Sequence, residues 1–213
     1  MSSIAKPSPS RQHGRPARPL NCSIFITDIV GYSDPRRDDH DRMVLRSTLS
    51  RILTDAFVES GLAWRRCRHQ DRGDGLLTVV PPTLSTSILI DPLLPLLGES
   101  IHRHNRGALD QLQIRLRSAL HVGPVLLGDT GYPNASVIQA ARMLDSDSLR
   151  CTLDGNDHTF ATMVSSYVYE NVARHMRGAV TPDAFRRTWY QAGSAPATSW
   201  IYVSRMTDEG GWQ

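Results

Sequence analysis

The sequence predicts an α+β fold with a ferredoxin-like βαββαβ core, extended near the C-terminus by an extra helix and strands. Short apolar runs typical of buried strands alternate with longer segments whose apolar residues have helical spacing. These elements come in the order strand, helix, strand, strand, helix, strand. Two of the strand-like runs are joined by a glycine-containing turn, which is typical of a hairpin. We therefore expect a mainly antiparallel sheet with helices on one face.

The first elements are defined by their apolar spacing. Residues 21–27 form a continuous apolar run typical of a buried strand. Residues 38–60 place apolar side chains on one helical face, and Gly61 follows at a position that suits a helix C-terminus. Residues 62–69 and 76–80 are expected as strands of a hairpin, with the turn "RGDG" between them. This hairpin would place Asp74 at or beside its tip.

The later elements follow the same criteria. A helical region interrupted by prolines covers residues 83–106, and residues 113–122 alternate as in a half-buried strand. The remaining expected elements are a helix over 136–144, a strand over 158–164, a helix near 167–175, and a closing hairpin of strands 185–191 and 199–204.

The composition indicates one folded domain with a tail at each end. Of 213 residues, 40% are hydrophobic, as in ordinary soluble proteins. We expect a basic, disordered tail over residues 1–20, a folded domain over 21–204 and a short C-terminal tail over 205–213. The N-terminal tail contains four basic residues and no acid, so its charge of +4 exceeds the net charge of +3 and the rest of the chain carries −1. A nearly neutral folded body argues against a nucleic-acid-binding domain.

The sequence also argues against membrane and secreted classes. No apolar run approaches the roughly 20 residues that span a bilayer, and the first twenty residues lack the apolar centre of a secretory signal. The three cysteines, Cys22, Cys67 and Cys151, are widely spaced and odd in number. This pattern fits reduced thiols and a cytoplasmic location.

Two aspartates carry the strongest chemical signal. Asp28 ends the first strand, and Asp74 lies in the predicted hairpin turn. In a βαββαβ sheet the first and third strands can be neighbours, which would bring both carboxylates to one rim. Together with the Ile29 carbonyl they would bind a hard divalent cation through oxygen. Either motif alone could be an ordinary turn; the pair in this order points to a metal site.

At these residues the chain resembles a family, the class III nucleotidyl cyclases (the adenylate and guanylate cyclase catalytic domain). The resemblance lies in "FITDIVGYS", "GDGLLTVV", "LRSALHVGPV" and "ASVIQAARML", which come in the family's order and cover roughly residues 21–150. Residues 157–203 are less diagnostic.

The resemblance implies an enzyme that converts a nucleoside triphosphate to a 3′,5′-cyclic monophosphate and pyrophosphate. Asp28, Asp74 and the Ile29 carbonyl would bind two Mg²⁺ or Mn²⁺ ions, and Arg142 would stabilise the transition state from the opposite subunit of a homodimer with active sites at the interface. The loop that would bind the phosphates consists of Val30, Gly31, Tyr32 and Ser33.

Three positions differ from the family pattern. Ile138 stands where an asparagine usually orients the ribose, four residues before Arg142. Gln70 stands where purine cyclases carry a base-reading lysine or glutamate. The second base-reading residue should fall within residues 128–132, where Asp129 is a displaced candidate. Asn134 and Gln139 are polar neighbours that would compensate for Ile138.

The differences leave two interpretations open. The first is a changed base, as in the pyrimidine cyclases of bacterial anti-phage signalling, where the Gln70 amide would suit a uracil or cytosine edge. The second is a catalytically silent module that acts by dimerisation or protein binding. Both metal aspartates and Arg142 are present, which favours an enzyme. A nucleic-acid binder that uses the basic tail is a more distant third.

Overall fold

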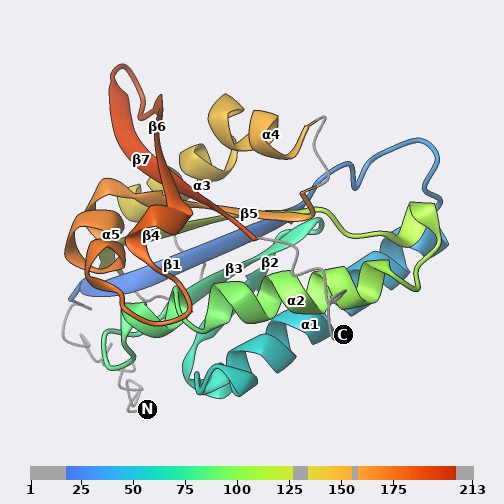
Figure 1. The fold of residues 1–213 in the computed structure, drawn as a ribbon, viewed down its shortest axis with the longest axis horizontal. Helices are drawn as coiled ribbons and strands as arrows, with labels where there is room; N and C mark the ends of the chain where they lie inside the picture. The colour runs from blue at the N-terminus through green and yellow to red at the C-terminus, as the bar shows by residue number, and fades with distance from the viewer. Residues whose placement is uncertain (1–17, 127–133, 155–157, 205–213) are drawn as a thin grey trace, which may run out of the picture.

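The computed structural model describes residues 18–126, 134–154 and 158–204, and the expected tails fall largely outside these ranges. Within them one mixed sheet has seven strands in the order β2-β3-β1-β4-β5-β7-β6 (Figure 1). Only β4 and β5 pair in parallel, so the predicted mainly antiparallel α+β sheet is confirmed. The strands are β1 (Leu20–Ile29), β2 (Arg68–Asp71), β3 (Gly75–Val80), β4 (Leu116–Val125), β5 (Phe160–Ser165), β6 (Phe185–Gln191) and β7 (Pro196–Val203).

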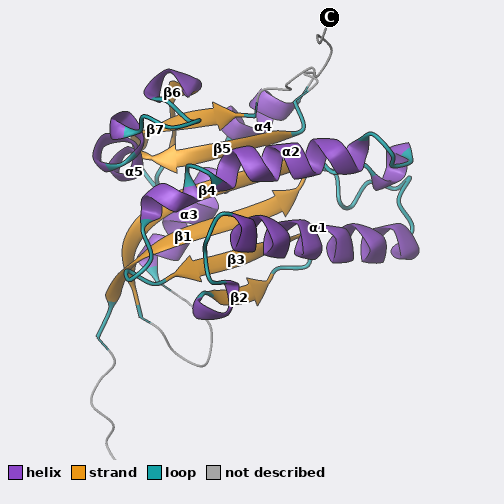
Figure 2. Ribbon diagram, turned by 60° about the horizontal axis from the view of Figure 1, so that its bottom comes forward, coloured by secondary structure: helices purple, strands orange, loops and turns teal. Residues whose placement is uncertain are grey.

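Helices cover both faces of the sheet, so the expectation of helices on one face is wrong. Phe25 of β1 packs into a core with helices α1 (Asp39–Glu59), α2 (Leu93–Asn105) and α5 (Ser166–Asn171). Its neighbours Ile24 and Ile26 point the other way, into a core with α3 (Ala135–Leu144) and α4 (Asp147–Leu153). Figure 2 shows α1 and α2 side by side along one face of the sheet. Because helices cover both faces of the sheet, eight consecutive residues of β1 are buried.

Helix α1 begins and ends where the sequence predicts. The Asp38 carboxylate accepts a hydrogen bond from the Asp41 N–H, and the Asp41 carboxylate accepts one from the Asp38 N–H, which forms a capping box. At the other end Gly61 has φ +82°, a left-handed conformation that favours glycine.

Two expected elements differ in detail. Residues 62–69 do not form one strand: Trp64–Arg66 is a 3-10 turn, and β2 begins only at Arg68. The Trp64 ring stacks on His69 at 3.7 Å and meets Phe57 edge-on at 5.1 Å, which draws the chain out of an extended path. Helix α4 is not among the expected elements, because seven residues are too few for a clear periodicity.

The pairing of β1 positions the candidate site. Asp28 lies opposite Gly75 of β3 and opposite Arg117 of β4. The end of β1 and the turn before β3 therefore lie at the same rim of the sheet, as predicted. No helix in the described ranges is long and apolar enough to cross a membrane.

Candidate functional site

Asp28 and Asp74 lie together at the rim of the sheet. Asp28 is the ninth residue of β1 and only 7% exposed. Asp74 lies in the turn between β2 and β3, and its carbonyl accepts a hydrogen bond of 2.9 Å from the Ile29 N–H. This bond ties the turn to the end of β1 directly beside Asp28. The first and third strands are neighbours, and the two aspartates approach each other, as predicted from their spacing.

The turn that carries Asp74 depends on two glycines for different reasons. Gly73 has φ +89°, and its N–H donates to the Asp71 carboxylate at 2.7 Å. At Gly75 a Cβ atom would lie 1.8 Å from the Thr27 carbonyl oxygen. Gly75 therefore allows the two backbones to approach, whereas the sequence suggested only a tight turn.

Asp28 already has a cationic partner. The Arg117 Nε and Nη2 both lie 2.6 Å from the Asp28 Oδ2. Arg117 also lies 3.6 Å from Asp145, and Arg150 lies 3.3 Å from the same carboxylate. Sequence reasoning did not single out Arg117, because its partner depends on the register of β1 against β4.

The electrostatics of Asp28 reflect its burial. Burial raises the pKa of Asp28 to about 6; Arg117 opposes this shift, and the neighbouring Asp74 adds to it. A carboxylate held close to a second carboxylate is stabilised by positive charge, which a divalent cation supplies. The two carboxylates and the Ile29 carbonyl therefore fit such a cation. Among the described residues no group of three or more acidic, histidine or cysteine side chains forms a metal site, so the remaining ligands would come from substrate or water.

A cavity of about 340 Å³, which we call the carboxylate cavity, opens beside the pair. It is lined by Asp28, Ile29, residues 30–34, Asp74, Arg117, Arg150 and Asp154.

Residues 30–33 form a turn, here called the glycine loop, in which Gly31 has φ +69°. The Val30 N–H donates to the Arg115 carbonyl at 2.8 Å, and the Tyr32 N–H donates to the Ile29 carbonyl at 3.3 Å. The N–H groups of Gly31 and Ser33 have no acceptor within the described ranges. They are the loop donors open to a ligand.

Arg142 lies outside the carboxylate cavity. It is exposed on α3 and lines a larger cavity of about 810 Å³, which we call the Arg142 cavity. Ile138 and Trp189 line the same cavity and are 48% and 64% exposed. A single chain thus places Asp28 and Asp74 on one cavity and Arg142 on another.

The remaining predicted residues are only partly engaged. Gln70 is exposed on the edge strand β2 and lines neither cavity. Asn134 accepts a hydrogen bond from the Leu126 N–H at 3.1 Å, and Gln139 donates to the Tyr190 hydroxyl at 2.9 Å. Both amides are therefore used inside the chain, so compensation for Ile138 by either is not supported. Residues 128–132, including Asp129, lie outside the described ranges.

Comparison with known proteins identifies the fold. The guanylyl cyclase Cya2 superposes with a TM-score of 0.62 at 13% identity and covers 91% of this chain and 98% of its own. The adenylate/guanylate cyclase/hydrolase from Silicibacter pomeroyi superposes with a TM-score of 0.63 at 18% identity. The match covers 89% of this chain and 99% of that protein. The guanylate cyclase domain of RhGC from Catenaria anguillulae, in complex with GTP, superposes with a TM-score of 0.55 at 17% identity. The match covers 87% of this chain and 98% of that domain.

No family model and no curated protein matches the sequence. The chain has the class III nucleotidyl cyclase fold over nearly all of its length, at identities where only the fold is shared.

Proposed function

We propose that this protein is a nucleotidyl cyclase that converts a nucleoside triphosphate to a 3′,5′-cyclic monophosphate and pyrophosphate. The observation that carries the proposal is the Asp28–Asp74 pair, which lies beside a glycine loop at the rim of a class III cyclase sheet. In the reaction the 3′-oxygen bonds to the α-phosphorus, the bond from that phosphorus to the bridging oxygen breaks, and pyrophosphate leaves with its electrons. The 3′-hydroxyl proton is released.

Three oxygen donors of the carboxylate cavity would hold the catalytic ions. Asp28, Asp74 and the Ile29 carbonyl would bind two Mg²⁺ or Mn²⁺ ions, which supply positive charge to the triphosphate and acidify the 3′-hydroxyl. The free N–H groups of Gly31 and Ser33 would donate to phosphate oxygens. Arg117 would exchange Asp28 for another anionic partner once a cation is bound, and Asp145 is already within 3.6 Å of it.

A second copy of the chain would complete each site. Arg142 lines a different cavity from the aspartates of its own chain, so the arginine that meets a bound triphosphate would come from the other subunit of a homodimer. Its guanidinium would donate to the phosphate oxygens where charge develops. Gln70 lines neither of these cavities in the described part of a single chain, so it would face the base only in the dimer, where its amide would suit the donor and acceptor pattern of UTP or CTP. This would place the protein among pyrimidine cyclases of anti-phage signalling.

The first experiment is product analysis by mass spectrometry. Purified protein would be incubated with ATP, GTP, CTP and UTP separately in the presence of Mn²⁺. We expect one cyclic product, absent for Asp74→Ala and retained for Asp55→Ala, which removes an exposed carboxylate on α1. A purine product would support the cyclase and exclude the pyrimidine assignment.

A silent dimerisation module is the second candidate. It is favoured by Ile138, which replaces the ribose-orienting asparagine with a half-exposed apolar side chain. Absence of product from all four nucleotides, with a folded dimeric protein, would overturn the cyclase proposal in favour of this module.

A further inference from the structure

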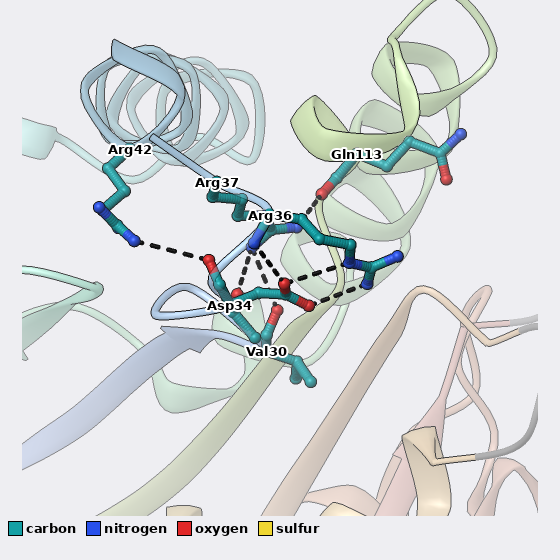
Figure 3. A network of polar contacts seen from close by, with 7 residues as sticks. Val30, Asp34, Arg36, Arg37, Arg42 and Gln113 are labelled. Carbon is teal, nitrogen blue, oxygen red and sulfur yellow. Dashed lines mark hydrogen bonds and ion pairs between the residues drawn. The ribbon is translucent and has the colours of Figure 1, made fainter. Parts of the chain in front are cut away.

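A third cavity, which we call the loop cavity, shares the glycine loop with the carboxylate cavity. It has a volume of about 290 Å³, and its lining includes the three arginines Arg36, Arg37 and Arg115. The residues common to both cavities are Val30, Gly31 and Asp34, so this segment is the wall between them. Figure 3 shows the polar network at this wall, where Arg36 and Arg37 approach Asp34 and Val30.

The arginines of the loop cavity differ in how their charge is balanced. Arg36 is paired with Asp34 through two bonds, Nε to Oδ1 at 3.1 Å and Nη2 to Oδ2 at 2.8 Å. Arg37 donates only to carbonyls, to that of Gly31 at 2.9 Å and to that of Gln113 at 3.0 Å. Arg37 therefore has a guanidinium charge with no carboxylate bonded to it among the described residues.

Arg115 is the least satisfied of the three. It has no ion pair within the described ranges, and its buried Nη2 has no hydrogen-bond partner. A buried donor without an acceptor costs stability, more so when it belongs to a charged group. Asp110 also lies on the cavity wall, and its charge acts on Arg36. Three arginines face two carboxylates on this wall, so the described lining has a net positive charge, and the Arg115 Nη2 is left without an acceptor.

Arg115 and Arg37 also hold the backbone of the glycine loop. The Arg115 carbonyl accepts the Val30 N–H at 2.8 Å, while the Arg37 guanidinium donates to the Gly31 carbonyl. A ligand bound between these two side chains would therefore contact the residues that fix the loop conformation.

We propose that the loop cavity binds a small phosphate oxyanion, at a site separate from the one for the nucleotide. The guanidinium groups of Arg37 and Arg115 bind its oxygens in charge-assisted hydrogen bonds. Occupancy stiffens residues 30–33 from the side opposite to the carboxylate cavity. The anion is either free phosphate or pyrophosphate, which share this chemistry.

The test is isothermal titration calorimetry of the full-length protein with inorganic phosphate, and separately with pyrophosphate, in EDTA at constant ionic strength. No turnover is measured, so the outcome is independent of cyclase activity. We expect saturable binding that Arg115→Gln weakens at least about tenfold. Gln111→Glu adds a negative charge at an exposed position of the same cavity and should also weaken binding. This second variant keeps the test decisive if Arg115→Gln does not fold.

Two arginine variants are the matched controls. Arg103→Gln removes an exposed arginine of α2, and Arg150→Gln removes one from the carboxylate cavity. Both should bind phosphate as the unaltered protein does. Weaker binding in Arg150→Gln with no change in Arg115→Gln would move the anion to the carboxylate cavity and overturn the proposal. If neither phosphate nor pyrophosphate shows saturable binding, the proposal is overturned as well. If both bind, the one with the higher affinity is the anion that the cavity takes.

Discussion

Asp28 experiences two opposing charges at the residue scale. Arg117 lies 2.6 Å from its carboxylate, while Asp74 repels it from the neighbouring turn. Burial exceeds the effect of Arg117, so the pKa of Asp28 is raised to about 6. A cation therefore competes with a proton as well as with the guanidinium.

This competition predicts a pH dependence of metal binding. Only the ionised carboxylate binds a cation, and Asp28 is mostly protonated below about pH 6. Mn²⁺ affinity should thus be constant above about pH 7 and fall by up to about tenfold per pH unit below about pH 6. Calorimetric Mn²⁺ titrations between about pH 5 and about pH 8 measure it. Asp28→Asn lacks this ligand, so Mn²⁺ binding should be weak at every pH. A residual affinity that still falls below about pH 6 would assign the inflection to another group.

A second residue-scale prediction concerns Ile138. Its side chain is 48% exposed on the wall of the Arg142 cavity, where it cannot donate or accept a hydrogen bond. Ile138→Asn supplies an amide that would orient the ribose, so we expect kcat for the accepted nucleotide to rise roughly three- to tenfold. Unfolding free energy should change by less than about 0.5 kcal/mol, since the position is half exposed.

The matched control for this change is Ala135→Asn, which adds an amide at the exposed start of the same helix. It should leave kcat unchanged. If Ile138→Asn has the same kcat as the unaltered protein, the ribose does not contact this position.

The sequence could predict those site residues whose position depends little on tertiary contacts. Asp28 lies near the end of β1 and Asp74 in the turn before β3, and the order of these strands brings both to one rim, so their proximity was predictable. Arg117 was not, because it meets Asp28 only through the register of β1 with β4. A strand carries no signal for the register of its partner when both faces are buried, since the apolar pattern is then continuous rather than alternating.

At the scale of elements, the predictable strands and helices are those with long periodic patterns. Helix α1 and strands β1 and β3 are confirmed at their expected places. The helical region of residues 83–106 begins later than expected: a 3-10 turn covers Thr86–Leu89, and α2 starts at Leu93, directly after Pro92. Proline ends the preceding segment and suits the start of a helix. Short elements such as α4 depend on packing against the sheet and have little local signal.

The pairing of β1 with β3 gives an element-scale prediction. Because a Cβ at Gly75 would lie 1.8 Å from the Thr27 carbonyl oxygen, Gly75→Ala must separate the two strands. We expect a loss of about 2 to 4 kcal/mol in unfolding free energy, together with loss of Mn²⁺ binding, because Asp74 moves away from Asp28. Urea unfolding and calorimetry measure the two effects.

Gly107→Ala is the control for this substitution. A Cβ there meets no atom within 4 Å, so the unfolding free energy should change by less than about 1 kcal/mol. Equal stability of the two variants would show that the strands tolerate a side chain between them.

At the scale of the whole molecule, the chain exposes apolar side chains next to a proposed catalytic group. Ile138 and Trp189 are 48% and 64% exposed, and both line the cavity that contains Arg142. Large apolar side chains that gather at one place on a surface are typical of interfaces. A homodimer that brings the Arg142 cavity of one subunit to the carboxylate cavity of the other would cover them and complete the site.

Mixing two inactive variants tests this arrangement. Asp74→Ala removes a metal ligand and keeps Arg142, whereas Arg142→Ala does the reverse. If each site takes its aspartates from one chain and its arginine from the other, a mixed dimer contains one intact site and one doubly impaired site. Random exchange of equal amounts makes half of the dimers mixed, so product formation should recover to about a quarter of the unaltered rate. If both groups instead served a site within one chain, no pairing would restore activity, and the mixture would stay as inactive as its components.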